Sequence, residues 1–73
     1  MVTVYSKPNC MQCNFTKKYL EDKGIPFQTI DVFEDPQALD HIKSLGFQSL
    51  PVVEGEETRP FNGFRPDLLS QLA

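Results

Sequence analysis

Segments of β-branched and aromatic residues predict four strands in this chain. The first runs from Val2 to Ser6, and Lys7, Pro8 and Asn9 then end it with a tight loop. Three further strands are expected at Phe27 to Val32, at Leu50 to Glu54 and at roughly Arg59 to Phe61. A loop containing Gly55 separates the last two, which therefore predict a hairpin.

Apolar residues recur at helical spacing in three other segments, each bounded by residues that start or stop helices. The first helix is expected from about Met11 to Lys23, where Gly24 supplies a left-handed cap. The second should begin at Asp35-Pro36, because Asp accepts hydrogen bonds from exposed amides and Pro needs none at the first helical position. It should stop at Gly46, and the third helix opens at Pro66. The side chains expected to face the core are Phe15, Tyr19 and Leu20 in the first helix, Leu39, Ile42 and Leu45 in the second, and Leu68, Leu69 and Leu72 in the third.

This order of elements, β-α-β-α-β-β-α, predicts an α/β fold. Strands that alternate with helices pair in parallel, and the terminal hairpin adds an antiparallel pair to the same sheet. The expected architecture is a four-stranded mixed sheet with three helices that cover both faces. Because 73 residues leave no room for a second core, we expect a single domain over residues 1–73.

Charge and hydropathy narrow the classes of partner. The formal net charge is −3, the sequence pI is about 4.9, and Lys and Arg do not cluster, which disfavours binding to nucleic acid. No apolar run approaches the roughly 20 residues of a membrane span, and the first residues lack the features of a signal peptide. We therefore expect a monomeric, cytoplasmic protein that acts on neither nucleic acid nor membranes.

Two cysteines carry the candidate chemistry. Cys10 lies between the first strand and the first helix, so its sulfur should face the unpaired amides and the positive end of that helix. Lowering a thiol pKa from ~8.5 to ~7 takes roughly 2 kcal/mol, which the helix dipole and one amide hydrogen bond supply. Lys7 could add to this support of the thiolate. Cys13 lies one helical turn further on, so we expect Cys10 to attack a partner disulfide and Cys13 to resolve the mixed disulfide.

Three other uses of this pair remain open. A structural bridge would close a loop of four residues, which stabilises by only ~2 kcal/mol. A closed metal site needs more ligands than two thiolates, and His41, the sole histidine, is expected on the solvent side of the second helix. A copper-carrier domain also places two cysteines between a strand and a helix, but its order of elements differs and it has Met where this chain has Pro8. We therefore expect no metal.

The segment from Val4 to Cys13 resembles the glutaredoxin branch of the thioredoxin superfamily. Three further features, Gln12, the run Leu50 to Val53 and the run Asn62 to Asp67, make the whole chain similar to the NrdH-redoxins, small electron donors to class Ib ribonucleotide reductase. The resemblance implies the thioredoxin fold and a thiol–disulfide oxidoreductase. It also implies two protein partners, thioredoxin reductase and the large subunit of class Ib ribonucleotide reductase. No bound cofactor is implied, because NADPH and FAD belong to thioredoxin reductase.

The same resemblance implies which residues contact these partners. They are Met11, Gln12, Leu50, Pro51, Phe64 and Arg65. The Leu50-Pro51 bond is expected to be cis, so that the backbone of Leu50 faces an incoming chain. Phe64 and Arg65 stand where glutathione-using relatives carry small residues, which disfavours the alternative of a glutathione-dependent glutaredoxin. Arg65 could instead pair only with Asp67 at the start of the last helix.

Overall fold

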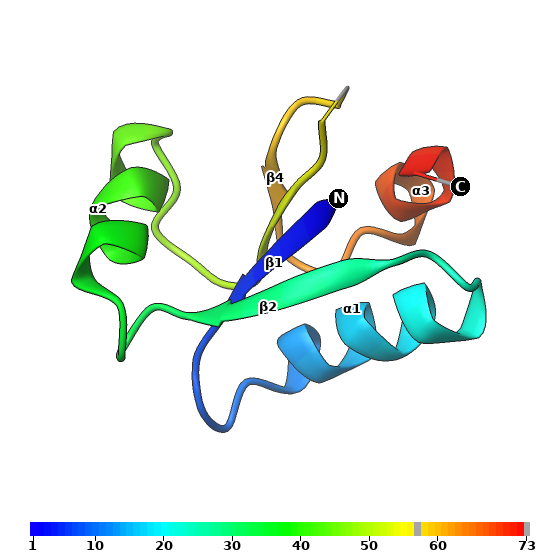
Figure 1. Ribbon diagram of the computed structural model, residues 1–73, viewed down its shortest axis with the longest axis horizontal. Helices are drawn as coiled ribbons and strands as arrows, with labels where there is room; N and C mark the ends of the chain where they lie inside the picture. The colour runs from blue at the N-terminus through cyan, green and yellow to red at the C-terminus, as the bar shows by residue number, and fades with distance from the viewer. Residues whose placement is uncertain (57, 73) are drawn as a thin grey trace.

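A mixed sheet of four strands forms the centre of the molecule (Figure 1). The computed structural model describes residues 1–56 and 58–72. Its strands are β1 (Val2–Ser6), β2 (Phe27–Asp31), β3 (Val52–Glu54) and β4 (Phe61–Asn62), in the order β2-β1-β3-β4 across the sheet. β1 pairs in parallel with β2 and antiparallel with β3, which in turn pairs antiparallel with β4. The parallel first pair and the antiparallel second half are as the sequence predicts.

Three helices complete the predicted order of elements. They are α1 (Met11–Asp22), α2 (Pro36–Ser44) and α3 (Pro66–Leu69), the last continued by a short 3-10 helix at Ser70–Leu72. The Asp35 carboxylate accepts hydrogen bonds from the backbone N–H groups of Gln37 and Ala38 at 3.1 and 3.2 Å, so the predicted N-cap of α2 is formed. Gly24, directly after the C-cap of α1, has a φ of 68°, the left-handed conformation expected of it.

The helices cover opposite faces of the sheet. On one face, Leu20 of α1 and Leu69 of α3 pack against Val4 of β1. On the other face, Ile42 of α2 packs in a second cluster that includes Tyr5 of β1. All five residues of β1 are buried, because this strand lies between the two clusters. The segment that follows β1 therefore begins between the two clusters, and it carries both cysteines.

The expectation that Phe15 faces the core is wrong, because its side chain is 51% exposed. α1 buries Cys13, Thr16 and Leu20 instead, which lie three and four residues apart and so share one side of the helix. Thr16 tolerates burial because its hydroxyl donates a hydrogen bond to the backbone carbonyl of Gln12 at 2.9 Å. The apolar pattern alone favours Phe over Thr as a buried residue and therefore predicts the wrong buried side for this helix.

Three smaller differences from the predicted elements have local causes. Leu45, expected in the core, lies beyond the last residue of α2 and is 37% exposed. β3 begins two residues later than predicted, and β4 is displaced to Phe61–Asn62. Pro51 and Pro60 directly precede these strands, and a proline has no N–H to contribute to strand pairing.

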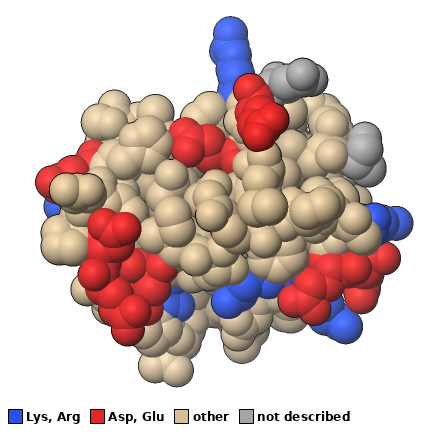
Figure 2. All heavy atoms as spheres, viewed as in Figure 1, with Lys and Arg blue, Asp and Glu red and all other residues tan. Residues whose placement is uncertain are grey.

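Charged side chains lie mainly around the edge of the face in Figure 2, and uncharged side chains cover its centre. Lys18 and Asp22, one turn apart on α1, approach to 3.8 Å, and the amine of Met1 contacts the carboxylate of Glu56. Both ion pairs are exposed and therefore add little stability. Across residues 1–56 and 58–72, none of the helices has the length and apolar character that crossing a membrane requires.

Candidate active site

The two cysteines lie where β1 leads into α1. Cys10 is the N-cap of α1, with φ −99° and ψ 107°, and Cys13 lies in the first turn. They are joined by a disulfide, and their Cα atoms are 5.2 Å apart. Cys10 is 7% exposed, whereas Cys13 is fully buried at 0%. An approaching sulfur atom therefore reaches Cys10 before Cys13.

One backbone amide donates a hydrogen bond to the sulfur of Cys10, and a second donates to its carbonyl. The N–H of Cys13 donates to Sγ of Cys10 at 3.1 Å, and the N–H of Asn14 donates to the carbonyl of Cys10 at 3.2 Å. Asn9 turns the chain from β1 into the helix with a φ of 60°, a left-handed conformation that Asn adopts more readily than most residues. Sγ of Cys10 thus lies at the positive end of α1 and beside an amide donor, as the sequence predicts. Both features favour negative charge on this sulfur once the bond is reduced.

Two loops from the C-terminal half of the chain are hydrogen-bonded to each other beside the disulfide segment. The first contains Leu50-Pro51, whose peptide bond is cis, as the resemblance implied. The second loop follows β4, and its Gly63 donates its N–H to the carbonyl of Pro51 at 2.8 Å. The side-chain amide of Asn62 donates to the hydroxyl of Ser49 at 2.6 Å. Pro51 is buried and Leu50 is half-buried.

Gln12, between the two cysteines, ties α1 to the second of these loops. Its Oε1 accepts a hydrogen bond from the backbone N–H of Phe64 at 3.2 Å. The phenyl ring of Phe64 in turn lies 5.9 Å from that of Phe15, tilted by 54°. The structure therefore brings three residues, Gln12, Phe64 and Phe15, together on the α1 side of the disulfide. The sequence pattern predicts Phe15 in the core and therefore gives no signal for its place in this group.

Arg65 is paired with Asp67, the second of the two arrangements that the sequence allowed. Nε and Nη2 of Arg65 donate to the two carboxylate oxygens of Asp67 at 3.2 and 3.0 Å. These hydrogen bonds hold the pKa of Asp67 below its usual range and raise that of Arg65. The side chain of Arg65 is still 53% exposed, so it remains on the surface beside Phe64.

Two further predicted site residues flank Cys10 in sequence. Met11 is 71% exposed, the largest exposed fraction among the exposed large apolar side chains of the described chain. Lys7 is exposed in the loop between β1 and Cys10. It lines a groove of about 420 Å³ together with Leu50 and Phe47, so Lys7 and Leu50 border the same hollow. The predicted contact residues thus lie on two sides of the disulfide segment, in loops and at the start of α1.

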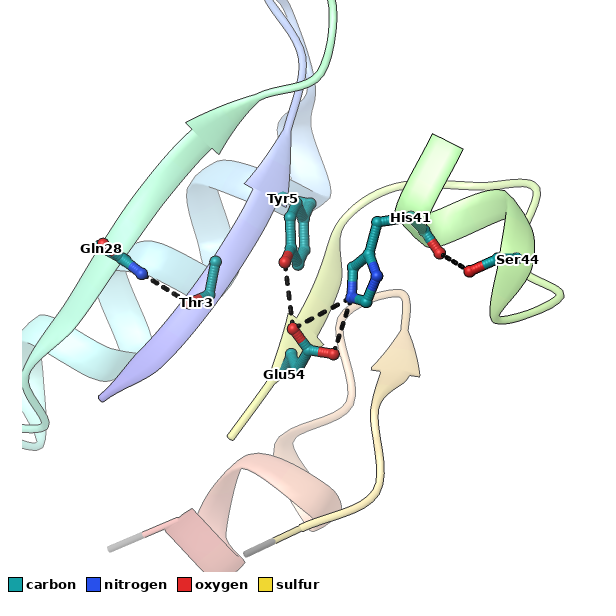
Figure 3. A network of polar contacts seen from close by, with 6 residues as sticks. All are labelled: Thr3, Tyr5, Gln28, His41, Ser44 and Glu54. Atoms are coloured by element: carbon teal, nitrogen blue, oxygen red, sulfur yellow. Dashed lines mark hydrogen bonds and ion pairs between the residues drawn. The ribbon is translucent and has the colours of Figure 1, made fainter. Parts of the chain in front are cut away.

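A polar network joins three elements on the α2 face of the sheet (Figure 3). The hydroxyl of Tyr5 donates to Oε1 of Glu54 at 3.0 Å, and Nε2 of His41 lies 3.0 Å from Oε2 of the same carboxylate. Burial, with the hydrogen bond to Glu54 second, raises the pKa of Tyr5 to about 12. His41 lies on the exposed side of α2, as predicted. Its contact with Glu54 gives no signal in the sequence, since the partners come from separate elements.

The arrangement of these residues suits thiol–disulfide exchange. Within the two described stretches of chain, no group of three or more His, Cys, Asp or Glu side chains is placed to hold a metal ion. The two cysteines instead bond to each other at a helix N-terminus, with Cys10 at the surface. A four-stranded mixed sheet with helices on both faces and such a disulfide defines a thiol–disulfide oxidoreductase with the thioredoxin fold.

Comparisons with known proteins give the family. Residues 2–57 match the model of the Glutaredoxin family. The glutaredoxin-like protein NrdH of Lactococcus lactis is 44% identical over 73 residues, which are 100% of each chain. NrdH of Salmonella typhimurium is 38% identical over 71 residues, which are 97% of this chain and 86% of that one. The solved structure of NrdH-redoxin from Escherichia coli has a TM-score of 0.94 and 36% identity, covering 99% of this chain and 93% of its own. The chain belongs to the glutaredoxin family and, within it, to the NrdH-redoxins.

Proposed function

We propose that this chain carries two electrons from thioredoxin reductase to class Ib ribonucleotide reductase. The Cys10 thiolate attacks the disulfide that turnover leaves in the large subunit of ribonucleotide reductase, which forms a mixed disulfide and releases one partner thiolate. The Cys13 thiolate then attacks Sγ of Cys10, which forms the intramolecular disulfide and releases the second partner thiolate. Thioredoxin reductase returns two electrons and two protons to the chain, and NADPH and FAD act on its side of the exchange.

The difference in exposed area between Cys10 and Cys13 supports the proposal that Cys10 attacks and Cys13 resolves. Cys10 reaches the surface with 7% of its area, and Cys13 has none exposed. The amide of Cys13, 3.1 Å from Sγ of Cys10, stabilises charge on the attacking sulfur. Lys7, in the loop before Cys10, adds a positive charge to this region. Cys13 can remain buried, because its thiolate attacks only Sγ of Cys10 when it resolves the mixed disulfide.

Residues around the disulfide are proposed to contact the partner protein. Met11 and Leu50 belong to different faces of the molecule, since Leu50 packs with the α2 cluster and Met11 begins α1. Pro51 supports the backbone of Leu50, and Gln12 fixes the loop that carries Phe64. A partner whose sulfur reaches Cys10 therefore meets apolar side chains on both sides. We place the cycle in the cytoplasm, where cysteine pairs of this kind act as transient disulfides.

The proposed electron source follows from the residues that occupy the loop before α3. Phe64 is half-buried, and its ring packs against the core cluster under α1. The ring therefore occupies space that the tripeptide glutathione would need. Arg65 lies beside it on the surface. The Escherichia coli relative is described as a glutaredoxin-like protein with a thioredoxin-like activity profile. We extend that profile to this chain, and glutathione as electron donor is the second candidate.

A coupled assay separates the two electron sources. The consumption of NADPH is followed with a protein disulfide as final acceptor, in one arm with thioredoxin reductase and in the other with glutathione and glutathione reductase. We expect rapid turnover in the first arm and at least tenfold slower turnover in the second. Efficient turnover only in the second arm would make the chain a glutathione-dependent glutaredoxin and overturn the proposal.

A further inference from the structure

Two successive backbone N–H groups in the loop between β4 and α3 are each bonded to another part of the chain. The N–H of Gly63 donates to the carbonyl of Pro51 at 2.8 Å. The N–H of Phe64 donates to Oε1 of Gln12 at 3.2 Å. Gly63 has a φ of 82°, and successive N–H groups in turns of this kind form concavities that bind anions. Here a backbone carbonyl and a side-chain amide take the place of an anion.

The cation of the same loop is occupied as well. Nε and Nη2 of Arg65 donate to the two carboxylate oxygens of Asp67, at 3.2 and 3.0 Å. A guanidinium that is bound in this two-pronged way is matched in charge and geometry, so it is less available to another carboxylate. The loop thus carries two donors suited to a carboxylate, the N–H of Phe64 and the guanidinium of Arg65, and other side chains of the protein cover both.

The hydrogen bond from Phe64 to Gln12 contributes little to folding. Gln12 is exposed, and water competes with its amide for the N–H of Phe64. α1 and α3 are held together instead by the core cluster that contains Leu20 and Leu69. A Cβ added at Gly63 would lie 3.6 Å from Oε1 of Gln12, so this amide lies directly over the turn. Its place between the two cysteines points to a role in the choice of reductant.

We propose that Gln12 is a specificity-determining residue that closes this loop to glutathione. Its Oε1 occupies the N–H of Phe64, the donor that a carboxylate of glutathione would take while the glutathione sulfur approaches Cys10. The inference rests on the proposed function, in which the electron donor is a protein, and it adds a polar contribution to the steric exclusion by Phe64. A protein donor brings its sulfur to Cys10 without a free carboxylate of this kind, so the bond of Gln12 does not oppose it.

Reduction by glutathione consumes two molecules of the thiol for each disulfide. The first thiolate attacks Sγ of Cys10, which forms a mixed disulfide and releases the Cys13 thiolate. The second attacks the glutathione sulfur of that mixed disulfide, which releases the Cys10 thiolate and oxidised glutathione. Two electrons pass to the cysteines, and the two thiol protons follow them. The first step brings glutathione against the loop, so it is the step that Gln12 slows.

Replacement of Gln12 tests this role, with Gln37 as a matched control. Gln37 is also an exposed glutamine and also the second residue of its helix, α2. Gln12→Met removes the acceptor at similar size and should raise the rate constant for reduction of the disulfide by glutathione roughly fivefold to tenfold. Gln12→Glu keeps an acceptor oxygen and adds a negative charge, so this rate constant should stay at or below that of the unaltered chain. Gln37→Met should change it by less than about twofold.

A thiol without a carboxylate separates recognition from chemistry and folding. Mercaptoethanol should reduce the unaltered chain and the three variants at rates that agree within about twofold, because it has no group that binds the N–H of Phe64. Equal rates with glutathione for the unaltered chain and Gln12→Met, or the same increase with mercaptoethanol or in Gln12→Glu, would overturn the role of Gln12 and leave the proposed function intact. Faster reduction of the unaltered chain by glutathione than by thioredoxin reductase would overturn the proposed function, and the role of Gln12 with it.

Discussion

Tyr5→Phe should lower the stability of the fold and weaken its response to alkaline pH. The pKa of Tyr5 is raised from 10.0 to about 12 in the folded protein, chiefly by burial and then by the hydrogen bond to Glu54. Two pKa units correspond to about 2.7 kcal/mol at about 1.36 kcal/mol per unit. The side chains of His41 and Glu54 are 43% and 31% exposed, so solvent screens part of this interaction. We therefore expect about 1 to 2 kcal/mol to depend on the protonated state of Tyr5.

The direction of the pH effect follows from the raised pKa. Above pH 10 the phenol of Tyr5 ionises first in the unfolded chain, while the folded state still holds it protonated. The contribution of protonated Tyr5 to the free energy of unfolding is therefore fully present below about pH 10 and is lost as the pH rises to about 12. Below this range, Tyr5→Phe still removes one hydrogen bond, which costs about 1 kcal/mol.

Urea unfolding at about pH 8 and about pH 11 measures this contribution. On going to the higher pH, Tyr5→Phe should lose about 1 kcal/mol less stability than the unaltered chain. Tyr19→Phe, at the half-buried tyrosine of α1, serves as the control and should keep the alkaline loss that Tyr5 causes. An alkaline loss of the same size in Tyr5→Phe and the unaltered chain would refute the reasoning about this network.

The remaining predictions concern the cysteines, the loop before α3 and the α2 cap. Cys10→Ser should abolish disulfide reduction in an insulin-reduction assay, because the remaining thiol, that of Cys13, is fully buried and does not reach a partner disulfide, and substantial turnover would sink the two-cysteine mechanism. Cys13→Ser should stall as a mixed disulfide with its partner, seen as a covalent adduct on a non-reducing gel; normal turnover without adducts would reverse the roles. Phe64→Gly combined with Arg65→Gly should raise glutathione-dependent turnover roughly tenfold, and an unchanged rate would refute the steric argument. Asp35→Ala should remove the two hydrogen bonds of the α2 cap and about 1 kcal/mol, lowering Tm by about 4 to 8 °C in a thermal scan, so an unchanged Tm would contradict the cap's contribution.

Features that depend on neighbouring residues could be predicted from the sequence. Asp35-Pro36 starts α2 because the cap and its amides lie within four residues of one another. Cys10 and Cys13 could be placed at a helix N-terminus for the same reason. The cis bond before Pro51 was implied only by the resemblance to a family, since the local residues allow either isomer.

Features that depend on contacts between distant elements could not be predicted. The side of α1 that faces the core is set by how the helix lies on β1 and α3, and a satisfied Thr16 there displaces Phe15 to the surface. The hydrogen bond between Tyr5 and Glu54 joins residues 49 positions apart, and no periodic pattern marks such a pair. The contact of Gln12 with Phe64 spans 52 positions and depends on the loop after β4 in the same way.

Reconstitution of the complete electron pathway tests the central claim most directly. NADPH, thioredoxin reductase, the chain and class Ib ribonucleotide reductase are combined without other thiols, and the formation of deoxyribonucleotide is measured over many turnovers. We predict continuous formation with the unaltered chain, and loss of this activity with Cys13→Ser, whose mixed disulfide cannot be resolved. No formation of deoxyribonucleotide with the unaltered chain, or the same rate with Cys13→Ser, would contradict the account.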